Sequence, residues 1–363
     1  IELNDWFDRA LRLIHRTVPP TLFLIRNLEA NMGLLVDGQW QDRWYENNGD
    51  GEFQREQAQR RDWITADGTP GQDDRAAVQA QAGRYHLYVS LACPWAHRTL
   101  IYRKLKGLES LIDVSVVSWL MAEHGWTFDR EKGSTGDALD GLTYLHQRYT
   151  ADDKDYTGRV TVPVLWDREQ QRIVNNESAE LIRIFNTAFD ELTGSTLDLY
   201  PEPLRAEIDS LNERIYPHIN NGVYRAGFAS TQKAYEAAFD EVFAELDWLE
   251  QRLGERRYLT GEYLTEADWR LFTTIVRFDA VYHGHFKCNL RRIEDYPNLS
   301  NWLRELFQWS GIAETVDFTH IKQHYYASHR HINANGIVPK GPDLALHRAH
   351  DRDRLPGKGI WSR

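Results

Sequence analysis

The chain has 363 residues, of which 42% are hydrophobic and 12% aromatic, enough for a packed interior in one large or two medium domains. Its formal net charge of −11 argues against a nucleic-acid-binding protein, whose surface would be basic. No apolar run approaches the roughly 20 residues of a membrane span, and two cysteines, Cys93 and Cys288, make no disulfide framework. We therefore expect a protein of a reducing compartment, most simply the cytoplasm.

The first 82 residues predict little regular structure. Residues 1–31 are apolar and basic, and residues 6–14 are compatible with a short amphipathic turn. We interpret this segment as a dispensable extension. Residues 32–82 are polar, with several Gly and Pro after residue 48, and predict an irregular arm.

Residues 83–198 predict a thioredoxin-like domain, a small sheet with helices packed on it. The expected elements are a strand at 84–90, a helix at 94–108, a strand at 113–119, an insertion at 121–159, strands at 160–167 and 172–176, and a helix at 177–189. The strands are rich in β-branched and aromatic residues, and the helices show apolar residues at a 3.6-residue period. The gap between the first two strands suits a βαβ crossover.

Residues 199–332 predict an all-helical domain. Amphipathic patterns cover 204–219, 234–253, 266–282 and 298–312, and no comparable strand signal follows residue 200. Thr265 and Asp268 have the spacing of a capping box at the start of the third helix. The tail at 333–363 is rich in Gly, Pro, His and Arg, and we expect it to wrap the surface or stay loose.

Cys93 is the leading candidate for chemistry. It lies just before Pro94 at a predicted helix start, where free N–H groups and the helix dipole stabilise a thiolate. His97 and Arg98 add positive potential. Because Ala96 stands where a Cys-x-x-Cys motif has its second thiol, a resolving thiol must come from outside, and glutathione is the abundant one in the cytosol.

Two further features fit a glutathione site. Pro163 follows Val162 at the entry to a predicted strand, where thioredoxin-like folds carry a cis-proline whose preceding peptide pairs with a bound peptide backbone. Glu177 and Ser178 open a predicted helix. They either cap it, as acidic and hydroxyl residues do in many helices, or hold the γ-glutamyl end of glutathione, Glu177 its ammonium and Ser178 its carboxylate.

The remaining candidates favour structural roles. Cys288 has nothing nearby in the sequence to ionise it, and it is interpreted as a small buried residue. His283 with His285, and His329 with His331, lack the spacing of helical metal ligands and have no accompanying carboxylate cluster. We therefore expect no metal.

Several motifs together resemble the xi-class glutathione transferases, the glutathionyl-hydroquinone reductases, from about Met32 to about Pro342. They are "MGLLVDGQW", "CPWAHR", "GWTF", "YTGRVTVPVLWD", "IVNNESAELIR", "FDAVYHGHFKCN" and "HYYASH". The resemblance implies a glutathione-dependent enzyme that removes glutathione from glutathionyl-hydroquinones through a cysteine–glutathione mixed disulfide, giving hydroquinone and oxidised glutathione. It also implies a homodimer formed through the helical domain.

The resemblance assigns roles to residues of this chain. It makes Cys93 the nucleophile, with two tyrosine hydroxyls, those of Tyr224 and Tyr325, stabilising charge and donating a proton. Its implied glutathione contacts are Trp126, Arg130, Val162, Pro163, Glu177 and Ser178, and its implied hydroquinone pocket consists of Tyr224, Tyr282 and Tyr325. Without the family, these tyrosines would be interpreted as ordinary packing residues.

This chain departs from the family pattern at Ser118 and Trp119, which replace a usual His-Pro pair near the pocket, and at Ala334, where proline is common. Two alternative functions remain. One is an omega-like thioltransferase or dehydroascorbate reductase, which shares the single catalytic cysteine. The other is a non-catalytic binding module with a glutathione-transferase-like fold.

Overall fold

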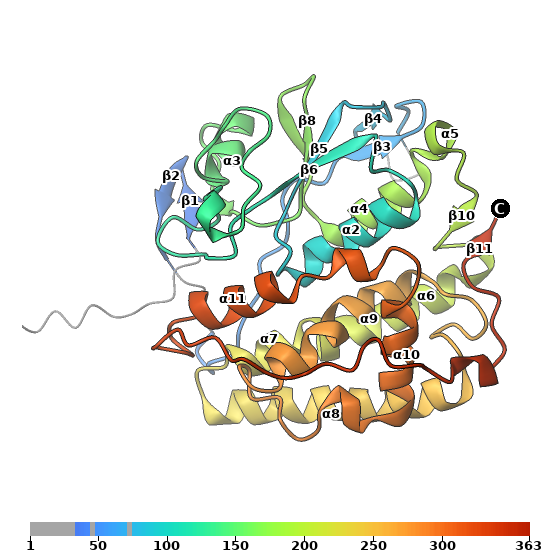
Figure 1. The fold of residues 1–363 in the computed structure, drawn as a ribbon. Coiled ribbons are helices and arrows are strands. Elements are labelled where there is room, and N and C mark those ends of the chain that lie inside the picture. Colours follow the sequence, from blue (N-terminus) through green and yellow to red (C-terminus); the bar gives the residue numbers. More distant parts are fainter. Residues whose placement is uncertain (1–32, 44–47, 71–74) are drawn as a thin grey trace, which may run out of the picture.

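The structure is a computed structural model that describes residues 33–43, 48–70 and 75–363. A layer of strands and helices lies on an all-helical bundle, with helix α11 (Phe318–Ser328) along the boundary between them (Figure 1). The thioredoxin-like and all-helical architecture predicted from the sequence is confirmed. The predicted extension at 1–31 lies outside the described residues.

A four-stranded mixed sheet forms the centre of the first domain. Its strands in spatial order are β6 (Ile112–Val116), β5 (Tyr85–Val89), β8 (Val164–Asp167) and β9 (Arg172–Asn175). β5 and β6 are parallel, as expected for a βαβ crossover through α2 (Pro94–Leu105), whereas β8 pairs antiparallel with both β5 and β9. Every residue of β5 and β8 is buried, because both are central strands.

The strand predicted at 160–167 is shorter than expected and begins only at Val164. Pro163 has no N–H to donate to a ladder, so pairing starts after it. The Val162–Pro163 peptide is cis, as predicted. The strand therefore presents a non-laddered backbone at 160–163 beside the start of α2.

The insertion and the arm hold each other in place. Within the insertion, α3 (His146–Asp152) is followed by β7 (Gly158–Arg159). β7 pairs with β1 (Leu34–Val36), which also pairs with β2 (Gln39–Gln41). The arm is thus less irregular than predicted, since short strands form where tertiary partners are available.

A second part of the arm packs against α4 (Ser178–Thr187). β3 (Trp63–Thr65) and β4 (Ala77–Gln79) pair in parallel. Arg61, just before β3, and Arg75, just before β4, both form ion pairs with Glu180 of α4. These contacts fix the arm to the helix that begins with Glu177 and Ser178.

Six α-helices account for most of the second domain, and all four predicted helical regions are confirmed. They are α6 (Arg205–Ile215), α7 (Gly222–Gly227), α8 (Gln232–Glu255), α9 (Glu266–Arg277), α10 (Pro297–Phe307) and α11. The first predicted helix changes to a π-helical turn at Tyr216–Asn220, where Pro217 cannot continue the i→i−4 pattern. A second π-helical turn, Phe278–Tyr282, follows α9. None of the described helices is long and apolar enough to cross a membrane.

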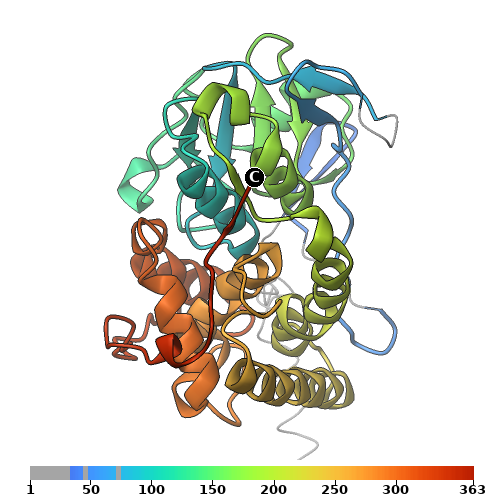
Figure 2. The ribbon, with the colours of Figure 1, turned by 90° about the vertical axis from the view of Figure 1, so that its right-hand side faces the viewer.

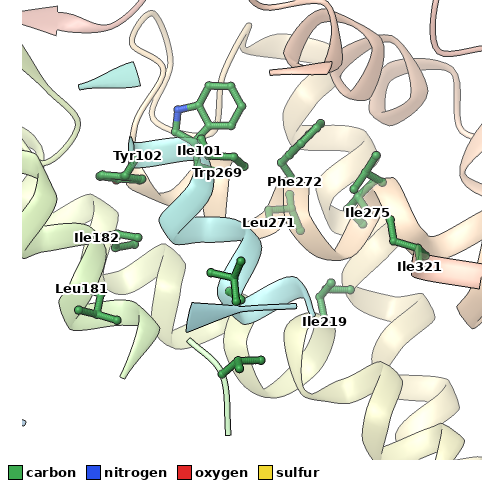
Figure 3. Close-up of a cluster of buried hydrophobic side chains, with 14 of the residues drawn as sticks. Ile101, Tyr102, Leu181, Ile182, Ile219, Trp269, Leu271, Phe272, Ile275 and Ile321 are labelled. Atoms are coloured by element: carbon green, nitrogen blue, oxygen red, sulfur yellow. The ribbon is translucent and has the colours of Figure 1, made fainter. Parts of the chain in front are cut away.

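The two domains share one apolar core around α2 (Figure 3). Ile101 and Tyr102 of α2 lie between Leu181 of α4 and Trp269 and Phe272 of α9, and all five side chains are buried. Each such side chain contributes roughly 1.5–3 kcal/mol on burial. The helix that begins at Cys93 is therefore fixed from both sides.

The predicted capping box positions α9 in this core. The Thr265 N–H donates to the Asp268 carboxylate at 3.1 Å. The same carboxylate accepts hydrogen bonds from the Leu259 N–H at 2.9 Å and from the Trp302 indole N–H at 3.1 Å. Asp268 therefore joins the start of α9 to the preceding loop and to α10.

The tail crosses the helical bundle and returns to the first domain (Figure 2). There β11 (Trp361–Ser362) pairs antiparallel with β10 (Leu197–Asp198). No strand was predicted in the tail, because a two-residue strand has no detectable period and forms only through its partner. Arg363 adds ion pairs to Asp190 and Asp198.

Replacing Arg352 by methionine should destabilise the protein by about 3–5 kcal/mol. Its buried guanidinium donates to the carbonyls of Leu253, Arg256 and Arg257, which end α8 or lie just beyond it. Urea unfolding followed by circular dichroism measures the change. Arg348→Met is the control, because Arg348 is 70% exposed, and it should stay within about 0.5 kcal/mol of the parent. Equal stabilities of the two variants would contradict this role of Arg352.

Candidate active site

Cys93 lies at the N-terminal end of α2, directly after β5 and beside the cis-proline loop. It is the N-cap residue of α2, with extended backbone angles, and its side chain is half-buried. Its thiol donates to the Val162 carbonyl oxygen, with 3.6 Å between sulfur and oxygen. The structure thus brings the two predicted site residues into contact.

Burial opposes ionisation of this thiol. Loss of solvent raises the pKa of Cys93, and this effect is larger than the opposing ones from the N–H groups of Ala96 and Trp95 and from the charges of Arg277 and Arg55. The helix-terminus effect expected from the sequence is present, but in this structure the protonated thiol is favoured. The sequence could not reveal this, because burial is set by the second domain.

The expectation that His97 adds positive potential is wrong. His97 is completely buried, and this holds its pKa well below the ordinary value, with the Arg277 charge acting in the same direction. Its ring accepts a hydrogen bond from Arg277 at Nδ1 (3.0 Å) and lies 2.8 Å from the Thr315 hydroxyl at Nε2. The buried Arg98 remains a cation with a pKa of about 9, lowered mainly by burial, but it donates to Ser178 and Asn220.

Arg277, at the C-terminal end of α9, is a contact that sequence reasoning missed. Its Nε donates to the Ala92 carbonyl at 2.8 Å, and its Nη2 donates to the Leu91 carbonyl at 3.0 Å. The fully buried guanidinium therefore holds the loop immediately before Cys93 against the helical domain. No local signal marks it, because the residues that it joins lie far apart in the sequence.

The three tyrosines named from the sequence meet at one point. The Tyr325 hydroxyl oxygen lies 2.5 Å from that of Tyr224 and 3.1 Å from that of Tyr282. Burial raises the pKa of each above its ordinary value. The hydroxyls therefore stay protonated at neutral pH and form a connected chain of donors.

Two adjoining pockets meet beside Cys93. The first, here called the aromatic pocket, is lined by Phe53, Arg55, Cys93, Trp95, Trp126, Val160, Thr161, Val162, Tyr224, Phe228, His324, Tyr325 and His329. Trp126 stacks on His324 with 4.9 Å between ring centroids. Phe53, Arg55, Phe228 and His324 were not singled out from the sequence, because only the fold brings these distant segments to the start of α2, and His329 was considered only as a metal ligand.

The second pocket, here called the polar pocket, contains four of the predicted glutathione contacts. Val162, Pro163, Glu177 and Ser178 line it, together with Arg55 and Trp95, which the two pockets share. The Glu177 carboxylate accepts the Ala179 N–H at 2.9 Å and so caps α4. The structure therefore agrees with both interpretations of Glu177, because a carboxylate that caps α4 can also face a ligand in the polar pocket.

Arg130 is not brought to either pocket. It is exposed on a 3₁₀ turn (Arg130–Lys132), and its guanidinium packs over Gly136, where an added Cβ would lie 2.4 Å from Nη2. Trp119 also lies outside both linings, but its carbonyl accepts a hydrogen bond from His324 Nδ1 at 3.0 Å. The segment that departs from the family pattern thus touches the aromatic pocket through its backbone.

The histidine pairs make contacts with one another and with aromatic rings. His285 Nε2 and His329 Nδ1 are 3.2 Å apart, and burial lowers the pKa of both. Within the described residues, no group of three or more His, Cys, Asp or Glu side chains has the arrangement of a metal site.

Comparison with known families and curated proteins gives consistent matches. The glutathione S-transferase N-terminal domain matches residues 92–188, and the C-terminal domain matches residues 232–305. The chain is 56% identical over 324 residues to glutathionyl-hydroquinone reductase YqjG of Escherichia coli strain K12, covering 89% of this chain and 99% of the relative. It is 53% identical over 316 residues to glutathionyl-hydroquinone reductase PcpF of Sphingobium chlorophenolicum, covering 87% and 98%.

Solved structures place the chain within one class. A xi-class transferase from Natrialba magadii superposes with a TM-score of 0.83 at 48% identity, covering 91% of this chain and 99% of that one. The chain is a xi-class glutathione transferase. The glutathione-bound structure of Escherichia coli YqjG matches this transferase with a TM-score of 0.81 at 54% identity, covering 88% and 99%. In this xi-class transferase, Cys93 opens the matched N-terminal domain, and α8 to α10 make up the matched C-terminal domain.

Iodoacetamide should modify Cys93 of the native transferase and leave Cys288 unmodified. Cys288 is completely buried, and burial raises its pKa to about 12. Because the folded pKa of Cys93 is raised, its thiolate fraction, and with it the rate, should climb about tenfold per pH unit until the thiol is ionised. Mass spectrometry of tryptic peptides measures both sites, and urea-unfolded protein, labelled at both, is the control. A rate at Cys93 independent of pH between 6 and 8 would contradict a buried, protonated thiol.

Proposed function

We infer that this chain is a glutathionyl-hydroquinone reductase, which uses glutathione to remove the glutathionyl group from glutathionyl-hydroquinones. The observation that carries this conclusion is the position of Cys93 in an aromatic pocket that adjoins a polar pocket. Tyr224 and Tyr325 line the aromatic pocket, whereas Tyr282, predicted to line it as well, lies buried behind Tyr325 and is hydrogen-bonded to it. Relatives named for this activity, at 56% and 53% identity over most of the chain, support it.

The two pockets suit the two halves of such a substrate. In the proposed complex the glutathionyl part occupies the polar pocket, with its ammonium at Glu177 and its γ-glutamyl carboxylate at Ser178 and the N-terminus of α4. The backbone of Val162 pairs with the peptide of glutathione. The hydroquinone ring then lies in the aromatic pocket, and its sulfur faces Cys93.

In the first step, the Cys93 thiolate attacks the sulfur of the glutathionyl adduct. A sulfur–sulfur bond forms to glutathione, and the bond between that sulfur and the aromatic carbon breaks. The electron pair stays on the aromatic ring, which takes up a proton and becomes the hydroquinone. Tyr224 and Tyr325, whose hydroxyls stay protonated because burial raises each pKa, donate to the charge that develops.

In the second step, the thiolate of a second glutathione attacks the glutathionyl sulfur of the mixed disulfide. Oxidised glutathione leaves, and Cys93 is released as a thiolate. Two glutathione sulfurs are thereby oxidised for each aromatic carbon that is reduced. Ala96, at the resolving position of a Cys-x-x-Cys motif, leaves the protein without an internal thiol for this step.

Cys93→Ala should abolish release of hydroquinone from glutathionyl-menadiol in the presence of glutathione. Cys93→Ser should do nearly the same, because a serine hydroxyl is not ionised near neutral pH. Chromatography of the released menadiol measures the rate. Cys288→Ala, which changes the other cysteine, a residue that lines neither pocket, should retain activity. Full activity of Cys93→Ala would overturn the mechanism.

The same assay, with a small mixed disulfide as a second substrate, separates the proposed reductase from the two alternative functions. A thioltransferase would reduce small mixed disulfides, such as that of glutathione with 2-hydroxyethanethiol, and leave glutathionyl-menadiol intact. A non-catalytic module would turn over neither compound. Release of menadiol at a rate well above the uncatalysed one is the expected result.

Tyr325→Phe should lower kcat for the glutathionyl-hydroquinone about 10- to 100-fold, because it removes the central hydroxyl of the tyrosine chain. Iodoacetamide labelling of Cys93 should remain close to the parent rate, since the thiol is unaltered. The matched control is Tyr326→Phe, whose hydroxyl donates to the Ala280 carbonyl at 3.3 Å and lies outside the tyrosine chain. A Tyr325→Phe variant with parental kcat would rule out a role of this hydroxyl in proton donation.

We further propose that the enzyme acts as a homodimer in the cytoplasm. The chemistry consumes reduced glutathione, which a reducing compartment supplies. The dimer is proposed on the resemblance to the xi class, and size-exclusion chromatography with light scattering measures it.

A further inference from the structure

Arg55, in the arm, lies where the two pockets meet. Its guanidinium carbon is 4.9 Å from the ring centroid of Trp95, 5.0 Å from that of Tyr224 and 5.4 Å from that of Phe53. Its Nε donates to the Asn221 side-chain oxygen at 3.1 Å. These contacts fix the cation against the aromatic walls and leave it lining both pockets.

Neighbouring arginines of the arm are paired with carboxylates, but Arg55 is not. Arg60 pairs with Asp152, and Arg61 pairs with Glu180. In the part of the chain that the structure describes, Arg55 forms no ion pair. Its charge therefore stays available to an anion in the pockets.

The aromatic pocket otherwise offers no permanent charge. Among the described residues that line it, Arg55 is the one side chain that is always ionised. The residue on which it stacks, Trp95, is two positions from Cys93 at the start of the same helix. An opposite charge within a few ångströms of a thiol favours its ionised form.

We propose that Arg55 is a positioning residue that stabilises the Cys93 thiolate from the mouth of the aromatic pocket, so that the arm completes the active site. This inference rests on Cys93 being the nucleophile of the proposed function. It assigns a role in the reaction to a segment outside the thioredoxin-like and helical domains. The arm reaches this place because Gly51 and Asp50 accept hydrogen bonds from Ser230 and Thr231, just before α8.

The other groups that face Cys93 are neutral or already engaged. Arg277 of α9 is the second cation, and its donors are bonded to backbone carbonyls and to His97. The hydroxyls of Tyr224, Tyr282 and Tyr325 keep their protons because burial raises the pKa of each. The imidazoles of His97, His324 and His329 are neutral because burial lowers the pKa of each. Glu56 and Glu177 line only the polar pocket. Arg55 is therefore the charge that can be changed without disturbing a buried network.

The test is the pH profile of Cys93 alkylation by iodoacetamide, in the full chain without glutathione. Arg55→Met should react about three- to tenfold more slowly at pH 7, because the thiolate loses a nearby cation. At the alkaline end of the profile, above the pKa of the thiol in each variant, the rates should converge. Arg55→Lys keeps the charge, and its alkylation rates should stay close to those of the parent. Arg60→Met removes a charge from the same arm outside both pocket linings, and its rates should also match those of the parent.

Four results would overturn the proposal. The first is a parental profile for Arg55→Met, even if the KM for glutathione rises, since Arg55 would then bind a substrate carboxylate instead. The second is a loss that persists at pH values above the pKa of the thiol in both variants, which would indicate displaced structure. The third is Arg55→Lys reacting as slowly as Arg55→Met, and the fourth is an equal shift for Arg60→Met. Because no substrate is present, these results are independent of whether glutathionyl-menadiol is turned over.

Discussion

The active site depends on one electrostatic constraint: the half-buried thiol of Cys93, between two domains, must lose its proton to react. Burial raises the pKa of Cys93, so the free N–H groups of α2 do not suffice by themselves. Two cations act against burial, one from each side. Arg277 reaches the loop before Cys93 from the helical domain, and Arg55 reaches the mouth of the pocket from the arm. The nucleophile is therefore a product of three separate parts of the chain.

The same burial that opposes a thiolate is useful on the other side of the pocket. The tyrosine hydroxyls have raised pKa values and so retain their protons at neutral pH. Because Tyr325 connects Tyr224 to Tyr282, a proton given to the substrate by one hydroxyl can be replaced from the next. Burial thus keeps the tyrosine hydroxyls protonated, and the positive charge of Arg55 stabilises the attacking thiolate of Cys93.

The segments outside the two domains contribute to this arrangement. The arm is bonded to the start of α8 at one point and to Glu180 of α4 at another, which holds Phe53 and Arg55 over the cleft between domains. The tail also connects the two domains. Its Arg352 satisfies carbonyls at the end of α8, and its last strand joins β10 of the first domain.

Local sequence signals were sufficient for much of the fold and for part of the site. Periodicity indicated the strands of the first domain and the four helical regions. The corner at Cys93, the Val162–Pro163 peptide and the capping box of α9 were each recognisable within a few residues. The errors had long-range causes. The final strand at Trp361–Ser362 forms only through its partner, and His97 is neutral because another domain covers it.

What the sequence by itself determined is the chemistry that the chain carries: a single thiol at a helix start without a resolving partner, and motifs of a known class. Only the tertiary structure decided the electrostatics of that thiol, because its pKa follows from what surrounds it. The sequence also named Arg130, whereas the fold leaves it exposed and places Arg55 between the pockets. Charge acts through space, and the two cations that act on Cys93, Arg55 and Arg277, are far from it along the chain.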